Sequence, residues 1–195
     1  AMHPSGRYLY YITATYLGVR RVDTQNGALN AAFAEVTGGI NTAIAIHPTG
    51  HFAYVTRMGN PGQVNVYRIR SSGPQVGQFV ASTPISSGGN DAVSIALHPT
   101  GRFLYVANRA SNDVAAFAVN PTTGELTGIG MPVSFNSPTV SVRVDYSGNF
   151  LYVVDSTPQV RTFAINTTTG ALAAVTPGLS IENSPRELVL TEDIE

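Results

Sequence analysis

Six charged side chains lie in polar, glycine-rich segments between predicted strands, where they could bind a small molecule. They are Arg57, Asp91, Arg109, Asp155, Arg186 and Glu187. The guanidinium of arginine is a planar fork of donors that suits carboxylates, phosphates and sugar oxygens. Together with Asn41, Asn90 and Asn108 in the same segments, these residues predict a site for a small polar or anionic ligand. The alternative is that they are ordinary solvated loop residues.

Arg143 differs from these residues because it lies inside a predicted strand, residues 140–144. The equivalent positions of the other repeats hold Ala45, Ala96 and Leu190. A lone buried charge is very costly, so this side chain must either reach a solvent-filled channel or meet an acidic partner. The sequence leaves both alternatives open: contact with the channel or its ligand, and a structural salt bridge.

The use of cysteine and histidine excludes several kinds of chemistry. The chain has no cysteine, and therefore no disulfide, thiolate metal site or cysteine nucleophile. Its four histidines show no paired ligand spacing, so we expect no transition-metal site and no cofactor. The pairs Gly38-Gly39 and Gly88-Gly89 fit turns, and the sequence contains no phosphate-binding loop, dinucleotide fingerprint or nucleophile elbow.

Composition and charge predict neither a nucleic-acid partner nor a membrane partner. The formal net charge is −1, and the 11 basic residues are arginines without a cluster that would attract a phosphate backbone. A hydrophobic content of 43% with 12% charged residues is typical of a folded, soluble chain. No apolar run approaches the roughly 20 residues that span a bilayer. The compartment stays open between cytoplasmic and exported.

One motif recurs four times and sets the elements that must position these side chains. It reads His-Pro-Ser-Gly-Arg-Tyr-Leu-Tyr from His3, recurs from His47 and His98, and returns in altered form from Asp145. A regular period of this size indicates an array of supersecondary units. We expect a single domain of four repeats, approximately 3–46, 47–97, 98–144 and 145–191. The repeated histidines are expected to be turn residues, because each intact unit has one at the same place.

Each repeat contains four predicted strands. Apolar residues alternate with period two before each turn, in residues 42–46, 93–97 and 140–144. A second strand rich in Tyr, Phe and Val follows the turn. Third strands are predicted at 63–69, 113–119 and 159–165, and weaker fourth strands at 29–36, 78–81, 128–133 and 172–175. Four antiparallel strands per unit, without helical periodicity, predict an all-β fold, a β-propeller with four blade equivalents.

The two ends of the sequence are expected to be complementary. Residues 186–191 align with the innermost strand of the preceding repeat, whereas the first repeat starts after that strand. The extra strand could close a ring within the chain, complete the first blade of a neighbour, or be part of a longer propeller. We expect a homo-oligomer in which two chains close head to tail into an eight-bladed ring, since this leaves no free strand edge.

The segments Tyr54-Val55-Thr56-Arg57 and Tyr105-Val106-Ala107-Asn108-Arg109 each follow His-Pro-Thr-Gly-x-Phe. They resemble the YVTN-type repeats of the lactonase-like propeller family, whose best-known members resemble 6-phosphogluconolactonase. The resemblance covers the whole chain and about four of the family's usual seven blades. It implies a site at one end of a central channel, built from Arg, His and Glu side chains, and it carries Arg109 over from an Asn-Arg pair after the second strand.

Two departures from the family pattern shape the functional prediction. Asp155-Ser156 stands where the resemblance implies an acidic partner, and no histidine precedes the innermost strands. Our main prediction is therefore a ligand- or protein-binding scaffold without catalysis. The alternative is a carbohydrate-lactone hydrolase, in which Arg109 and Arg143 stabilise an oxyanion and Asp91 or Glu187 activates water. A third possibility is a propeller fragment without independent function.

Overall fold

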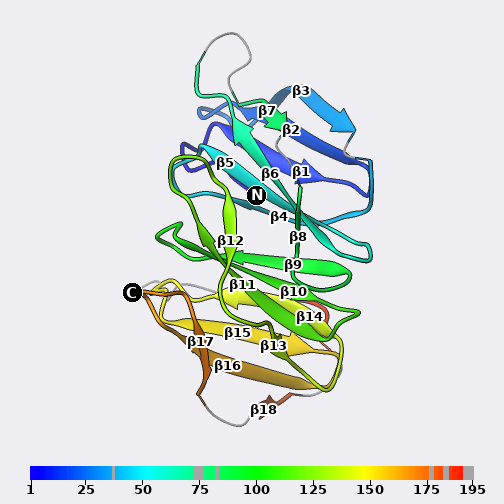
Figure 1. Cartoon of the computed structure of the whole chain (residues 1–195). Helices are drawn as coiled ribbons and strands as arrows, with labels where there is room; N and C mark the ends of the chain where they lie inside the picture. The colour runs from blue at the N-terminus through cyan, green and yellow to red at the C-terminus, as the bar shows by residue number, and fades with distance from the viewer. Residues whose placement is uncertain (37, 73–76, 82–83, 176–177, 182–184, 191–195) are drawn as a thin grey trace.

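The fold is seen in a computed structural model that describes residues 1–36, 38–72, 77–81, 84–175, 178–181 and 185–190. The described residues form four antiparallel sheets and no helix, so the all-β propeller prediction is confirmed (Figure 1). No helix among them is long and apolar enough to cross a membrane.

Each sheet is built from strands that follow one another along the chain. The first sheet holds β1 (Tyr8–Ile12), β2 (Tyr16–Val22) and β3 (Leu29–Val36). The second holds β4 (Asn41–Ile46), β5 (Phe52–Arg57), β6 (Gln63–Ile69), β7 (Phe79–Ala81) and β8 (Ile85–Ser86). The third holds β9 (Ala92–Leu97), β10 (Phe103–Asn108), β11 (Asp113–Val119), β12 (Leu126–Gly128) and β13 (Val133–Ser134). The fourth holds β14 (Thr139–Val144), β15 (Phe150–Asp155), β16 (Gln159–Ile165), β17 (Leu172–Ala174) and β18 (Leu179–Ser180).

The outer position of the second, third and fourth sheets is shared by two short strands. In the third sheet, β12 and β13 both pair with β11, so the single strand predicted at residues 128–133 is wrong. Gly130 has a φ of 60°, and Pro132 has no N–H to donate to a ladder. The chain therefore leaves the sheet after Gly128 and returns to it at Val133.

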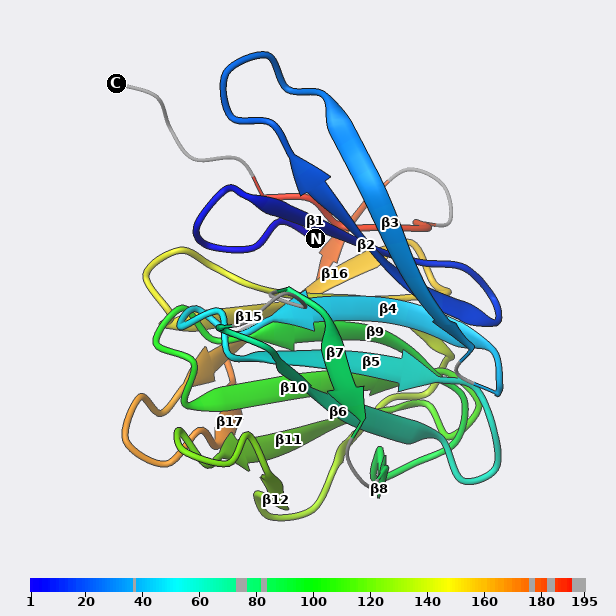
Figure 2. The same ribbon diagram turned by 90° about the horizontal axis from the view of Figure 1, so that it is seen from above.

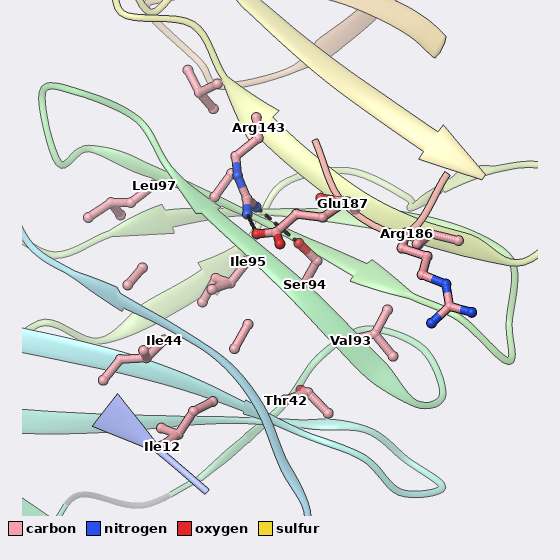
Figure 3. A pocket seen from close by; sticks show the side chains of 16 residues that line it. Ile12, Thr42, Ile44, Val93, Ser94, Ile95, Leu97, Arg143, Arg186 and Glu187 are labelled. Carbon is pink, nitrogen blue, oxygen red and sulfur yellow. Dashed lines mark hydrogen bonds and ion pairs between the residues drawn. The ribbon is translucent and has the colours of Figure 1, made fainter. Parts of the chain in front are cut away.

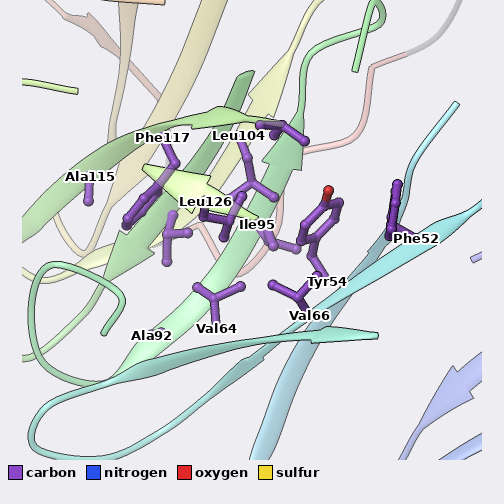
Figure 4. Packing of buried hydrophobic residues seen from close by; sticks show 12 residues of the cluster. Phe52, Tyr54, Val64, Val66, Ala92, Ile95, Leu104, Ala115, Phe117 and Leu126 are labelled. Atoms are coloured by element: carbon purple, nitrogen blue, oxygen red, sulfur yellow. The ribbon is translucent and has the colours of Figure 1, made fainter. Parts of the chain in front are cut away.

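The sheets stack with their faces together, and the innermost strands β4, β9 and β14 lie side by side. Figure 2 shows this stack from above. Alternating residues of neighbouring sheets interdigitate to form three cores. The core between the second and third sheets contains Tyr54, Leu104 and Phe117 (Figure 4). These residues are nearly inaccessible to water, and this burial is the main force that holds one sheet against the next.

The structure corrects the expectation for the C-terminal segment. Residues 186–190 form no strand and do not join the three-stranded first sheet, and residue 191 lies outside the described residues. Instead the backbone N–H of Leu188 donates to Ser141 Oγ of β14 at 3.4 Å, and Tyr146 Oη donates to the carbonyl of Leu190 at 3.2 Å. These contacts hold the segment against the fourth sheet. The head-to-tail dimer stays a prediction, which light scattering can test.

Candidate functional site

The innermost strands surround a cavity of about 690 Å³ along the axis of the stack (Figure 3). Its walls come from β4, β9 and β14, together with Ile12 at the end of β1 and the segment that follows the fourth sheet. The charged lining residues are Arg143, Arg186 and Glu187, which all come from the fourth sheet and that segment. Ile12 and Ile44 face them across the cavity, so one wall is charged and the other is not.

Arg143 and Glu187 form the closest ion pair of this cavity. Arg143 Nη2 lies 2.9 Å from Glu187 Oε1, and Arg143 Nη1 donates to the carbonyl of Val142 at 2.8 Å. The side chains are 31% and 66% exposed. Both alternatives left open for Arg143 therefore hold at once, because the guanidinium has an acidic partner and also lines the channel. The exposed carboxylate can reach water inside the cavity.

Asp91 and Arg109 lie in the loops at one end of the strands, where β9 begins and β10 ends. The backbone N–H of Arg109 donates to the carbonyl of Asp91 at 2.8 Å, and Arg109 Nη2 lies 4.0 Å from Asp91 Oδ2. Asp91 Oδ1 also accepts from the N–H of Gly59 at 3.2 Å, and Asp91 has a φ of 54°, which is uncommon for a residue other than glycine. The carboxylate of Asp91 thus links two loops, while half of the Arg109 side chain is open to solvent.

The asparagines that the sequence singled out have mainly structural contacts. Asn108 is fully buried, where its side chain contacts Ser87 Oγ at 2.6 Å and donates to Asp113 Oδ1 at 2.7 Å. Asn41 is buried and donates to the carbonyl of Thr13 at 3.1 Å. Asn90 is half-buried, and its backbone N–H donates to a serine hydroxyl of the neighbouring loop. A ligand could reach Asn108 only by breaking this network.

Asp155 and Arg57 are also engaged within the protein. Asp155 is fully buried, and its Oδ2 lies 3.1 Å from Arg161 Nε. Burial alone would raise the pKa of this carboxyl, but hydrogen bonds from Thr157 and the charge of Arg161 outweigh it and hold the pKa below the ordinary value. Arg57 donates to the carbonyl of Gly38, and its guanidinium packs against Gly39, in the space that a Cβ of that residue would occupy.

The histidines of the repeated turns join neighbouring repeats. His47 Nε2 lies 3.2 Å from the carbonyl of Gly101. Gly101 is the glycine of the next repeated turn, and it corresponds to Gly50 in the turn of His47. The backbone N–H of Thr49 donates to His47 Nδ1, so Nε2 carries the hydrogen that is shared with Gly101. A Cβ at Gly101, whose φ is 76°, would lie 2.3 Å from this ring nitrogen. No group of three His, Cys, Asp or Glu in the described ranges could hold a metal ion.

The contributions of Ser94 and Ser141 were missed at the sequence level. Ser94 Oγ accepts from Arg143 Nη1 at 3.4 Å, and Ser141 Oγ accepts from the backbone beside Glu187. A weak signal was present, because both serines interrupt apolar strands at a position where the second sheet has Ala43. The partnership between Arg143 and Glu187 has no signal in the sequence either, because it joins residues of two different repeats.

Comparison with known proteins gives a consistent picture. A family model described as "Lactonase, 7-bladed beta-propeller" matches residues 19–184. A 6-phosphogluconolactonase of Bacillus subtilis (strain 168) is 34% identical over 102 residues, which are 49% of this chain and 29% of that protein. A 6-phosphogluconolactonase of Yersinia pestis (strain Pestoides F) is 27% identical over 136 residues, which are 68% of this chain and 40% of that protein.

Solved structures show the same fold. The Pseudomonas aeruginosa periplasmic gluconolactonase superposes with a TM-score of 0.77 at 23% identity, over 95% of this chain and 54% of that one. A protein from Bacteroides fragilis NCTC 9343 superposes with a TM-score of 0.79 at 21% identity, over 98% and 56%. The chain spans less than half the length of these curated relatives and just over half that of the solved structures. By its repeats, its four antiparallel sheets and the family match, this chain belongs to the lactonase family of seven-bladed β-propellers.

Proposed function

We propose that this chain carries the lactone-binding site of a carbohydrate-lactone hydrolase. Family membership and the names of the relatives favour this function over the non-catalytic scaffold that the sequence analysis put first. The observation that carries the proposal is the pair formed by Arg143 and Glu187 in a cavity of ligand size.

The pair has the two kinds of group that lactone hydrolysis needs. The carboxylate of Glu187 can take a proton from a water molecule whose oxygen attacks the carbonyl carbon of the lactone. The guanidinium of Arg143 can stabilise the negative charge that develops on the carbonyl oxygen. The ring carbon–oxygen bond then breaks, the ring oxygen gains a proton to become a hydroxyl, and the product leaves as an open-chain hydroxy acid.

Arg186 lines the same cavity and provides a second cation. With two arginines and one glutamate among its charged lining residues, the cavity carries a net positive charge. A positive cavity attracts anionic substrates and also stabilises the carboxylate of the product. We assign to Arg186 the binding of an anionic or hydroxylated end of the sugar, through its donor fork.

Arg109 is the second candidate for contact with the substrate. Half of its side chain is exposed at the loop end of the stack, and its 4.0 Å separation from Asp91 leaves most of its donors available. Asp91 is a poorer candidate base than Glu187, because its carboxylate already accepts from the N–H of Gly59 and is less exposed, 34% against 66%. We therefore place Arg109 at the entrance of the site, where it binds the incoming anion.

A lactone assay tests the proposal directly. The purified protein should hydrolyse glucono-δ-lactone or its 6-phosphate faster than the spontaneous reaction does, as followed by acid release. Replacement of Arg143 by alanine should lower kcat/KM by about 100- to 1000-fold, the loss typical of an oxyanion-stabilising donor. Arg102→Ala is the matched control, because Arg102 does not line the cavity and donates to the carbonyl of Thr167.

Two results would contradict the proposal. One is a folded protein whose lactone turnover equals the spontaneous rate for both substrates. The other is an Arg143→Ala variant that retains the activity of the Arg102→Ala control.

A further inference from the structure

Ser94 and Ser141 occupy the same position on adjacent innermost strands. Ser94 pairs with Ala107 of β10 and Ser141 with Val154 of β15, and each is the first residue after a register shift in its strand. A bulge of this kind changes the direction of the side chain that follows it. Both serines are almost fully buried and line the cavity, beside the ion pair of Arg143 and Glu187.

Ser94 binds the arginine side of the pair. Its Oγ accepts from the backbone N–H of Val142 at 3.3 Å and from Arg143 Nη1 at 3.4 Å, across the boundary between the third and fourth sheets. Arg143 Nη1 also donates to the carbonyl of Val142 at 2.8 Å. With Nη1 fixed at two points, the guanidinium plane is fixed as well, and Nη2 is directed at Glu187 (Figure 3).

Ser141 binds the glutamate side. Its Oγ accepts from the backbone N–H of Leu188 at 3.4 Å, and Leu188 directly follows Glu187. The segment that carries Glu187 belongs to no sheet, so it lacks the ladder of hydrogen bonds that fixes an ordinary strand. This contact therefore holds the backbone beside the carboxylate at a set distance from β14.

We infer that Ser94 and Ser141 are positioning residues, which together hold the guanidinium of Arg143 and the carboxylate of Glu187 in a productive arrangement. The inference rests on the proposed lactone hydrolysis and assigns the serines no contact with the substrate. Small displacements of reacting groups lower rates steeply, so positioning residues should affect kcat more than KM. The two serines occupy equivalent positions in their repeats. The Ser94 hydroxyl orients Arg143, and the Ser141 hydroxyl holds the backbone beside Glu187.

The chain itself indicates that alanine is compatible with the fold at this position. Ala43 is the equivalent residue of the second sheet, where it pairs with Thr56 after the same kind of register shift. The strand beside Ala43 is β9, in which Ala96 corresponds to Arg143. Ala43 therefore has no neighbouring guanidinium that would need a hydroxyl acceptor. Ser94→Ala and Ser141→Ala should therefore fold. Beyond the pair, they remove the contacts that the two hydroxyls accept from the backbone N–H groups of Val142 and Leu188.

The experiment measures lactone hydrolysis by the wild type and by five variants of the full chain. Ser94→Ala and Ser141→Ala should each lower kcat roughly 10- to 100-fold, with KM changed less than about threefold. Ser94→Thr keeps the hydroxyl and should retain most of the activity. Ser5→Ala, in the first turn at the opposite end of the stack, should have wild-type kinetics, and Arg143→Ala should be the least active.

A structural readout accompanies the kinetics. Amide hydrogen exchange at Leu188 should be faster in Ser141→Ala than in the wild type, because the contact that protects this amide is gone. Unchanged exchange at Leu188 would contradict the role given to Ser141.

The outcomes separate this inference from the proposed function. If Arg143→Ala loses activity while both serine-to-alanine variants keep the wild-type kcat, the positioning role is wrong and the hydrolase function stands. If the wild type itself has no activity, the proposed function is overturned, and the positioning role that depends on it is overturned with it.

Discussion

The two ends of the strands differ across the stacked sheets. At one end, called here the turn end, are the repeated histidine turns, and at the other, the loop end, are the loops that hold Asp91 and Arg109. At the turn end, the same contact occurs in every intact repeat: His3, His47 and His98 each place Nε2 2.9–3.2 Å from a glycine carbonyl of the next repeat. At the loop end and in the channel, the repeats differ from one another. Arg143 has alanines at its equivalent positions in the second and third sheets. Arg109 is likewise confined to one repeat, since Met58 and Ser156 stand at its equivalent positions in the second and fourth.

This difference separates structural residues from candidates for chemistry. A contact that recurs in each repeat is required wherever two sheets meet, so it reports on architecture. A residue that breaks the repeat is not needed for stacking, and its charge must be explained by a local partner or by a ligand. Asp155 shows that a local partner is sometimes the full explanation, since Arg161 and Thr157 engage its carboxylate.

Asp155→Ala gives the largest expected loss of stability and tests whether loop-end charges can be structural. Removal of this fully buried carboxylate leaves Arg161 without its partner, so the free energy of unfolding should fall by about 3 kcal/mol. Urea denaturation measures the change. A loss below about 1 kcal/mol would mean that Asp155 is not held as tightly as its contacts indicate.

His98→Ala tests the contact that recurs at the turn end. The imidazole is buried and bridges Thr100 and the carbonyl of Gly148, so its removal should cost about 2 kcal/mol in the free energy of unfolding. Lactone turnover by the folded variant should be unchanged, because neither His98 nor the residues that it bridges line the cavity. A large loss of kcat without a loss of stability would break the distinction between the two ends.

The contact of His47 should also make stability depend on pH. Burial lowers the pKa of the His47 imidazole below 6.5, outweighing the hydrogen bond to the Gly101 carbonyl, which alone would raise it. Its contribution to stability is therefore complete above pH 6.5 and is lost as the pH falls below that value, where the unfolded chain binds a proton first. Thermal melts between pH 7 and pH 5 should show a smaller decrease for His47→Gln than for the wild type.

Two buried tyrosines offer a matched pair with a smaller effect. Tyr105 Oη donates to the carbonyl of Gly170 at 3.0 Å, whereas the Tyr54 hydroxyl has no hydrogen-bond partner among the described residues. Tyr105→Phe should lower the free energy of unfolding by about 1 kcal/mol, and Tyr54→Phe should change it by less than about 0.5 kcal/mol. Equal losses for the two variants in chemical denaturation would contradict the stabilising role given to the hydrogen bond of Tyr105.

Arg109→Ala should have only a small effect on stability. Its side chain is half exposed and lies 4.0 Å from Asp91, so the expected change in the free energy of unfolding is below about 1 kcal/mol. If Arg109 binds the incoming substrate, KM for the phosphorylated lactone should rise while kcat is retained. A fall in kcat as large as that of Arg143→Ala would move the reaction to the entrance of the channel.

Much of the fold could be predicted from the sequence because the signals are local. The third strands at residues 63–69, 113–119 and 159–165 have the predicted bounds, since period-two alternation and flanking Asx and glycine turns depend only on neighbouring residues. The outer strands were harder to predict. Their break in the third sheet depends on Pro132 and Gly130, which interrupt pairing without changing the overall composition of the segment.

The candidate site could be predicted only as a set of residues. Arg143 and Glu187 were both named from the sequence, but their pairing joins residues 44 positions apart. Asn108 has the composition of a ligand-binding residue, yet the network with Ser87 and Asp113 encloses it between two loops. Residue type shows what a side chain can bind, whereas its actual partner depends on which loops the stack brings together.

The sequence by itself determined the repeat, the strands within each unit and the turns between them, because these follow from the alternation of side chains and the backbone preferences of single residues. Only the tertiary structure decided that residues 186–190 lie against β14 rather than in the first sheet, and that Glu187 meets Arg143 in the channel. Those choices depend on hydrogen bonds and packing between sheets, where Ser94 and Ser141 provide contacts that no local pattern predicts.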